Sequence, residues 1–186
     1  MSQAAVVLAA GAGERFGGEG HKLLAPFRGR PLVAWAVQAA LEAGLDETVV
    51  ITGAVDLSAI LPEGLTVIEN HAWASGQASS LRTAVAWAER MGHDAVVIGL
   101  GDQPLVPARA WQAVAAERSR PIATATFAGK RRPPVRLARE VWDLLPVSGD
   151  EGARVLMAAR PHLVVEVACA GQPADVDTVE DLSRWS

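Results

Sequence analysis

The clearest candidate for chemistry in the 186-residue sequence is a loop of small residues near its start, followed by two basic residues. The loop consists of Leu8, Ala9, Ala10, Gly11, Ala12 and Gly13. Glycines let backbone N–H groups turn toward a ligand, and Arg15 and Lys22 add positive charge, so the combination suits a polyphosphate. An ordinary turn would need neither basic residue, which favours the phosphate-binding interpretation.

Two commoner phosphate-binding motifs do not fit this loop. A Walker A loop has its lysine between a glycine and a serine or threonine, whereas Lys22 follows His21 and precedes Leu23. A dinucleotide fingerprint needs a third glycine where this chain has Phe16, and the second apolar run, 47–52, ends without an acidic residue. These mismatches argue against both motifs and disfavour a redox role.

Two carboxylates follow apolar segments at positions suited to a metal. Asp102 comes soon after the apolar run 94–100, and open α/β sheets bind ligands at the carboxyl ends of their strands. One carboxylate there, together with substrate phosphates, is enough for Mg²⁺, although Asp102 could equally cap the following turn. Asp175 is our candidate for a second metal ligand, and Asp177, or else Thr178, is expected to cap the terminal helix.

Short apolar runs alternate with longer alanine-rich stretches along the chain. The predicted strands are 5–10, 47–52, 65–69, 94–100, 121–127 and 162–168, and the predicted helices are 31–44, 79–92, 107–119, 151–160 and 177–185. Strands that are apolar throughout are covered on both faces, so the pattern predicts an α/β fold with a mostly parallel sheet between helices. Ser79 or Ser80 is expected to cap its helix, and the basic, proline-containing segment 128–136 is expected to be an irregular excursion.

The overall composition narrows the class of protein. The chain has the length of one domain, half of its residues are hydrophobic, and its formal net charge is −4. Nucleic-acid and membrane-surface proteins need a basic face, so neither partner is expected. The lone cysteine, Cys169, and a start unlike a signal peptide predict a reducing compartment, with the cytoplasm as the default.

The loop and the residues after it resemble a known family. The pattern L-A-A-G-x-G-x-R-F-G, followed by K-L-L, is similar to the signature of the MobA-like NTP transferases, and its LAAG form resembles the molybdenum cofactor cytidylyltransferase (MocA-like) branch. Further matching segments occur in the family's order at 76–81, 101–104, 134–135, 149–154 and 175–182. The resemblance implies a three-layer, Rossmann-like nucleotidyltransferase fold in a single domain, 1–186, with a nucleotide-binding half (1–105) and an acceptor-binding half (106–186).

The resemblance also implies roles for individual residues. It makes Arg15, Lys22 and Asp102 catalytic, and gives Asp102 the role of binding Mg²⁺. The implied nucleotide-binding residues are these three with Leu8, Ala9, Ala10, Gly11, Ala12, Gly13, Gly76 and Ser80, of which Ser80 bonds the base. The implied acceptor-binding residues are Lys130, Arg132, Pro134, Asp150 and Arg154. Guanine-using relatives carry LAGG in place of LAAG, so the alanine pair implies a slot for a pyrimidine.

Together these features predict a Mg²⁺-dependent enzyme that transfers CMP from CTP to the phosphate of a molybdopterin-type cofactor and releases pyrophosphate. A phosphate monoester has a second pKa of about 6, so such an acceptor attacks without a general base. GTP, another phosphorylated acceptor, or a non-catalytic nucleotide-binding role remain as alternatives. Arg132 and Pro133 stand where the family has a small residue or histidine, which leaves the identity of the acceptor open. A molybdoenzyme or chaperone is the protein partner that this interpretation allows.

Overall fold

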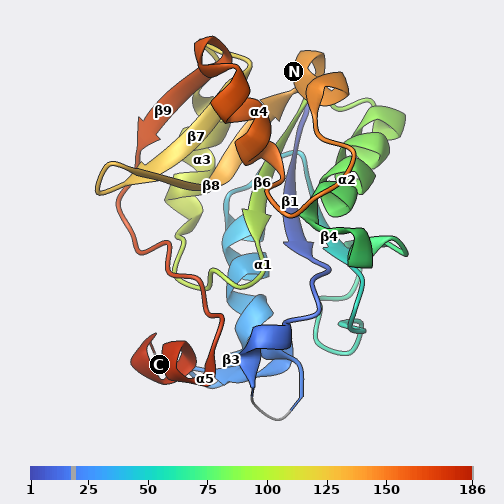
Figure 1. Cartoon of the computed structure of the whole chain (residues 1–186), viewed down its shortest axis with the longest axis vertical. Helices are drawn as coiled ribbons and strands as arrows, with labels where there is room; N and C mark the ends of the chain where they lie inside the picture. The colour runs from blue at the N-terminus through green and yellow to red at the C-terminus, as the bar shows by residue number, and fades with distance from the viewer. Residues whose placement is uncertain (18–19, 186) are drawn as a thin grey trace.

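The computed structural model describes residues 1–17 and 20–185 (Figure 1). Within these residues a seven-stranded sheet has the order β5-β4-β1-β6-β8-β7-β9. Its strands are β1 (Gln3–Ala9), β4 (Glu47–Thr52), β5 (Thr66–Glu69), β6 (Ala95–Leu100), β7 (Ile122–Phe127), β8 (Lys130–Ala138) and β9 (Val164–Ala168). The helices are α1 (Leu32–Glu42), α2 (Gln77–Met91), α3 (Ala108–Ala116), α4 (Ala153–Ala159) and α5 (Val179–Trp185). Shorter elements are the hairpin β2 (Pro26–Phe27) and β3 (Arg30–Pro31), and the 3₁₀ helices η1 (Glu14–Phe16), η2 (Lys22–Leu24), η3 (Trp73–Ser75), η4 (Arg139–Leu144) and η5 (Pro161–Leu163).

The sheet is mostly parallel. Neighbouring strands run parallel except where β8 pairs with β6 and β7. β1 lies between β4 and β6, and all of its residues are buried. A central parallel strand is covered by helices on both faces, and its sequence is therefore apolar throughout rather than alternating.

Two hydrophobic cores lie on the two faces of the sheet. Because successive strand residues point to opposite faces, Val7 packs with α1 and α3, whereas Val6 packs with α2, α4 and η4. The predicted α/β class, with a mostly parallel sheet and helices on both faces, is confirmed. No helix in the described part of the chain has the length and apolar character needed to cross a bilayer.

The segment 128–136 is not an irregular excursion, and that expectation was wrong. It forms a turn and most of β8, which pairs with β7 on both sides of a register shift and with β6 only over residues 135–138. Pro133 and Pro134 lie at the register shift, where neither neighbouring strand pairs with them. Proline has no backbone N–H to donate, so it is tolerated at this place. The start of β8 is exposed and basic, and its buried residues begin only at Pro134, so the sequence lacks an apolar run there.

The chain after β9 crosses back to the first half of the sheet. The backbone N of Val176 donates to the backbone O of Asp102 at 3.0 Å. Helix α5 then lies beside the β2–β3 hairpin (Figure 1), where Trp185 packs against the buried cluster of Phe27, Leu32 and Val176. This crossing brings Asp177 to the carboxyl end of β6.

Candidate active site

A pocket of about 650 Å³ opens at the carboxyl edge of the sheet, between the loop after β1 and the end of β6. We call it the loop pocket. Because β1 and β6 are parallel neighbours, their carboxyl ends meet there. The pocket is lined by every residue predicted to bind the nucleotide, namely Leu8, Ala9, Ala10, Gly11, Ala12, Gly13, Arg15, Lys22, Gly76, Ser80 and Asp102. The structure thus brings these residues together, and their individual roles stay predictions.

The loop after β1 is shaped by a left-handed glycine and a histidine. Gly13 has a φ of +67°, and a Cβ there would lie 3.0 Å from the side chain of Lys22. His21 Nε2 donates to Gly11 O at 2.9 Å and His21 Nδ1 accepts from Leu23 N at 3.2 Å, which assigns the neutral tautomer with its proton on Nε2. Burial, aided by the positive charge of Lys22, lowers the pKa of His21. Sequence reasoning missed this residue, because it looked only for metal-ligand spacing.

At the rim of the loop pocket, Lys22 and Arg15 form ion pairs with two carboxylates. Lys22 Nζ lies 2.7 Å from Asp102 Oδ2 and 3.0 Å from Asp177 Oδ1, and Arg15 Nη2 lies 3.2 Å from Asp177 Oδ2. Burial alone would lower the pKa of Lys22, but the charges and hydrogen bonds of Asp102 and Asp177 outweigh it and raise that pKa. The Arg15 side chain is 80 % exposed, so its ion pair is weak and the guanidinium is free to move to a phosphate.

The other oxygen of Asp102, Oδ1, is buried and has no hydrogen-bond partner among the described residues. Leaving a carboxylate oxygen unsatisfied is costly, and a divalent cation is a partner that would satisfy it. The described residues contain no group of three or more His, Cys, Asp or Glu side chains arranged to hold a metal. The donor set therefore fits an ion that takes one or two carboxylates and completes its shell with phosphate and water oxygens.

The second candidate metal ligand is Asp177 rather than Asp175. Asp177 lines the loop pocket with Asp102, whereas Asp175 lines the neighbouring pocket, and its Oδ1 accepts from Gln103 Nε2 at 2.6 Å. Partial burial raises the pKa of Asp175; the hydrogen bond from Gln103 opposes that shift, and the charges of Asp102 and Asp177 add to it. Sequence alone does not show which way each carboxylate of 175–177 points, so the metal role of Asp175 stays a prediction, and Asp177 is the carboxylate that the geometry favours.

Asp177 does not cap α5, contrary to expectation. Thr178 Oγ1 accepts from Asp181 N at 3.1 Å, and Asp181 Oδ2 accepts from Thr178 N at 3.0 Å. This reciprocal pair is a capping box, which satisfies the first N–H groups of the helix. The carboxylate of Asp177 is therefore left for Lys22 and Arg15.

Neither Ser79 nor Ser80 caps α2, so that expectation was also wrong. The helix begins at Gln77, two residues earlier, with Gly76 as its N-cap and no side-chain cap. Ser79 lies within the first turn and donates to Gly76 O at 2.8 Å. Ser80 is 5 % exposed and lines the loop pocket.

Gly76 is the point where the loop before α4 closes against α2. It has a φ of +104°, and a Cβ there would lie 2.6 Å from both Asp150 Oδ1 and Gly149 O. Ala78 N donates to Gly149 O at 2.9 Å, which ties the two segments together. Only glycine fits this contact, and Asp150 consequently stands between the loop pocket and a second pocket, both of which it lines.

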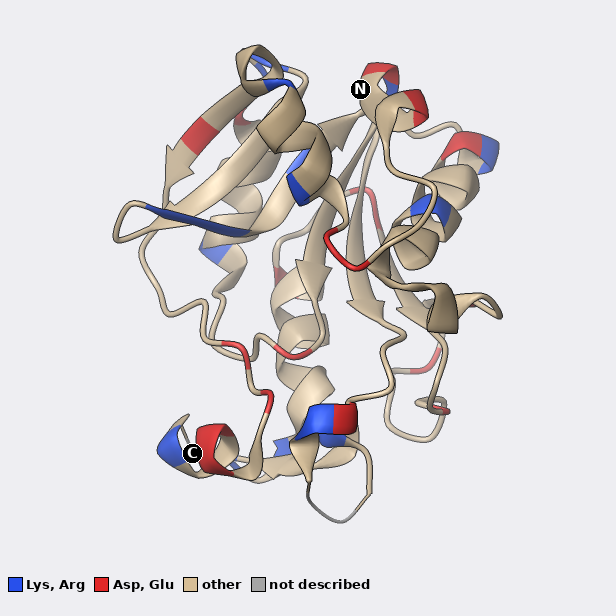
Figure 2. Ribbon diagram, in the orientation of Figure 1, with Lys and Arg blue, Asp and Glu red and all other residues tan. Residues whose placement is uncertain are grey.

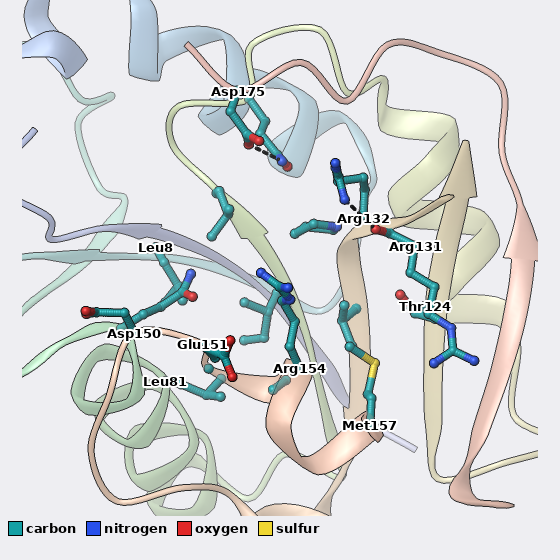
Figure 3. A pocket seen from close by; sticks show the side chains of 18 of the residues that line it. Leu8, Leu81, Thr124, Arg131, Arg132, Asp150, Glu151, Arg154, Met157 and Asp175 are labelled. Atoms are coloured by element: carbon teal, nitrogen blue, oxygen red, sulfur yellow. Dashed lines mark hydrogen bonds between the residues drawn. The ribbon is translucent and has the colours of Figure 1, made fainter. Parts of the chain in front are cut away.

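The second pocket, of about 490 Å³, has an apolar floor and an arginine-bearing rim (Figure 3). We call it the arginine pocket. Its apolar side chains are Leu8, Leu81, Ile98, Leu100, Val135 and Met157, and its charged ones are Arg131, Arg132, Asp150, Glu151, Arg154 and Asp175. Figure 3 shows Arg154 reaching into the middle of the pocket, with Asp175 at its rim. Figure 2 shows the basic start of β8 on the same side of the molecule as α4. Such a pocket suits a molecule with a flat or apolar body and an anionic group.

The predicted acceptor residues divide into two groups. Arg132, Asp150 and Arg154 line the arginine pocket. Lys130 and Pro134 do not line it: Lys130 is exposed beside the β7–β8 turn, and Pro134 borders a small gap next to Trp111. The structure therefore gives no support to an acceptor role for these two residues, because the segment that carries them is a strand.

Comparison with known proteins assigns the family. The model of the MobA-like NTP transferase domain matches residues 5–164. The chain belongs to the MobA-like NTP transferase family. This MobA-like chain is 36 % identical to nicotine blue oxidoreductase of Paenarthrobacter nicotinovorans, over 96 % of this chain and 94 % of that protein. It is 30 % identical to purine catabolism protein PucB of Bacillus subtilis (strain 168), over 95 % of this chain and 92 % of PucB.

A solved relative supports the fold. The structure of Rv0371c from Mycobacterium tuberculosis H37Rv, described as a complex with manganese, superposes with a TM-score of 0.81 and 28 % identity, over 100 % of this chain and 98 % of that one. The Rossmann-like nucleotidyltransferase fold is thereby confirmed. As a MobA-like NTP transferase the chain is a nucleotidyltransferase, and its family typically uses divalent metals.

Proposed function

We propose that this nucleotidyltransferase transfers CMP from CTP to the phosphate monoester of a molybdopterin-type cofactor, with Mg²⁺, and releases pyrophosphate. The observation that carries the proposal is the junction of the two pockets. Leu8, Gln77, Leu100 and Asp150 line both of them, so a nucleotide in the loop pocket and an acceptor in the arginine pocket would lie side by side. Direct transfer between two bound substrates requires this arrangement.

The reaction needs positioning more than proton transfer. An oxygen of the acceptor phosphate, dianionic near neutral pH, attacks the α-phosphorus of CTP; the new P–O bond forms as the bond from the α-phosphorus to the bridging oxygen breaks, and pyrophosphate leaves. The chain's task is to hold two anions in line and to offset their repulsion. Loop amides near Gly13 bind the triphosphate. Arg15 moves from Asp177, and Lys22 moves from Asp102 and Asp177, to the phosphate oxygens.

Asp102 and Asp177 would hold the divalent ion in the loop pocket. The bound ion supplies charge neutralisation at the triphosphate. Asp102 Oδ1, buried and unpartnered, supports this placement, because the protein leaves it no other partner among the described residues. Mg²⁺ is our choice, since it is bound through one or two carboxylates with substrate phosphates.

The acceptor proposal rests on the arginine pocket. Arg154 and Arg132 offer donors to a phosphate, and the apolar floor offers a surface for a flat ring system. The LAAG form of the loop favours CTP through the family resemblance. The lone Cys169 supports a cytoplasmic location, where a molybdoenzyme or its chaperone would receive the product.

The proposal is tested by pyrophosphate release. The protein is incubated with Mg²⁺, each of the four NTPs, and a molybdopterin, a sugar phosphate or phospholactate, with NADH and NADPH oxidation followed in parallel. Release with CTP and molybdopterin supports the proposal. Release only with GTP or another acceptor would overturn the substrate assignment, and binding without release would favour a non-catalytic accessory role. Reduced-nucleotide oxidation in place of release would favour the kind of activity named for the Paenarthrobacter relative.

A further inference from the structure

Asn70 links the end of β5 to the start of α2 through its side chain. It is 3 % exposed, and its backbone N donates to Thr52 O at 2.8 Å. Its Oδ1 accepts from Ala72 N at 3.0 Å, and its Nδ2 donates to Ser79 Oγ at 2.8 Å and to Ser80 Oγ at 3.0 Å. A backbone N–H can only donate, so the amide oxygen must face Ala72 and the amide nitrogen must face the serines. The direction of this network is thus determined.

The direction of the network decides what each serine hydroxyl can offer. Ser79 accepts from Asn70 and donates to Gly76 O at 2.8 Å, so its hydroxyl proton is engaged within the first turn of α2. Ser80 also accepts from Asn70, but its own proton has no acceptor among the described residues. Ser80 is buried and lines the loop pocket. Its hydroxyl is therefore preset as a hydrogen-bond donor toward whatever the pocket binds.

We propose that Asn70 is a positioning residue that orients Ser80 as a donor to the nucleobase and so selects cytosine over uracil. The inference rests on the proposed function, in which the loop pocket holds the base. Cytosine presents an acceptor at ring atom N3, whereas uracil carries N3–H there. The Ser80 hydroxyl, fixed as a donor by Asn70, can bond to the N3 acceptor of cytosine. With uracil it would face the N3–H donor, and two opposed donors are costly in a buried site.

The test reverses the network without changing its shape. In Asn70→Asp the carboxylate still accepts from Ala72 N, but it can only accept, so both serine hydroxyls must donate to it and Ser80 presents lone pairs to the pocket. We expect the dissociation constant for CTP, measured calorimetrically with Mg²⁺ and no acceptor, to rise about tenfold. The constant for UTP should stay level or fall, so that the preference for CTP is lost. An unchanged ratio of the two constants in folded Asn70→Asp protein would overturn the inference.

A double-mutant cycle separates this role from a merely structural one. Ser80→Ala should lower the CTP preference by itself, and Asn70→Asp should change it no further in that background. Should Asn70→Asp exert its full effect without the Ser80 hydroxyl, Asn70 would not act through Ser80. Ser79→Ala is the matched control, since Ser79 has the same amide contact and does not line the loop pocket; its CTP preference should equal that of the wild type.

The measurement also distinguishes this inference from the proposed function. Wild-type protein that binds CTP in preference to UTP, with both variants losing the preference, supports the inference whether or not transfer is seen. Wild-type protein that binds both pyrimidines equally overturns it while leaving nucleotidyl transfer intact. If Asn70→Asp does not fold, Ser80→Ala decides alone, because a retained CTP preference in that variant contradicts the proposal.

Discussion

The ammonium nitrogen of Lys22 bridges two carboxylates, 2.7 Å from Asp102 Oδ2 and 3.0 Å from Asp177 Oδ1. A positive charge thus already stands beside the oxygens that would hold a divalent ion. The triphosphate offers Lys22 stronger partners, and its arrival would leave both carboxylates to the metal. Nucleotide and metal are accordingly expected to bind together more tightly than either binds alone.

Replacing Lys22 by arginine should remove most activity although the charge is kept. Lys22 is one of two lysines among 17 basic residues, and its side chain is only 12 % exposed between two carboxylates. A planar guanidinium cannot occupy that space as a compact ammonium does. We expect kcat/KM for pyrophosphate release to fall about 100-fold in Lys22→Arg. The control is Lys130→Arg at the other lysine, which lies outside both pockets and should match wild type; wild-type turnover in Lys22→Arg would contradict the account.

Three of the aspartates that line the pockets, Asp102, Asp175 and Asp177, should differ in metal binding. Asp102→Asn and Asp177→Asn should each weaken Mn²⁺ binding in the presence of CTP at least about tenfold, since each removes a candidate ligand. Asp175→Asn should bind Mn²⁺ as the wild type does, because that carboxylate accepts from Gln103 and lines the arginine pocket. Electron paramagnetic resonance titration measures all three. A larger loss in Asp175→Asn than in Asp177→Asn would reverse the assignment.

Acid should destabilise the protein through His21. Burial lowers the pKa of His21 in the folded state below the usual value of about 6.5, so between those two pKa values the unfolded chain binds more protons. The contribution of His21 to the free energy of unfolding is therefore full above about pH 6.5. It decreases as the pH falls from that value toward the pKa of His21 in the folded state. Protonation also removes the acceptor that Nδ1 offers to Leu23 N. Denaturant melts at about pH 7.5 and about pH 5.5 should show a smaller loss of stability in His21→Gln than in wild type; equal losses would exclude His21 as a cause.

Arg154 should matter to the acceptor and not to the nucleotide. Its side chain reaches into the arginine pocket and is absent from the lining of the loop pocket (Figure 3). In Arg154→Met the KM for the phosphorylated acceptor should rise at least about tenfold while the dissociation constant for CTP is unchanged. Arg160→Met, at the far end of the same helix and outside both pockets, serves as control. A weaker CTP affinity in Arg154→Met would mean that the two pockets do not divide the substrates in this way.

The fold was predictable where local pattern and burial agree. The apolar run 5–10 became most of the central parallel strand β1, because a strand covered on both faces is apolar throughout. β8 was missed because only its last part reaches β6, its exposed start is basic, and two prolines follow that start. Periodicity cannot reveal a strand whose first half borders solvent.

The site was predictable where chain topology alone brings residues together. The loop that ends at Gly13 follows β1, and Asp102 follows β6. These strands are parallel neighbours, so the fold class alone predicts that the loop and the carboxylate meet. Asp177 reaches Lys22 and Arg15 through the long crossing after β9, and the sequence gives no signal for these ion pairs. It gives none either for the hydrogen bonds from Asn70 to Ser79 and Ser80. The division into halves at 105 and 106 stays a prediction, with the qualification that Asp177 of the second half lines the loop pocket.

The central claim, transfer of CMP between the two pockets, is tested most directly by the stoichiometry of the product. CTP labelled at the α-phosphorus is incubated with Mg²⁺, a molybdopterin acceptor and the protein, and both labelled adduct and pyrophosphate are measured. The account predicts one labelled acceptor for each pyrophosphate, and neither product with Asp102→Ala. Full activity of Asp102→Ala, or no labelled acceptor from the labelled CTP, would contradict it.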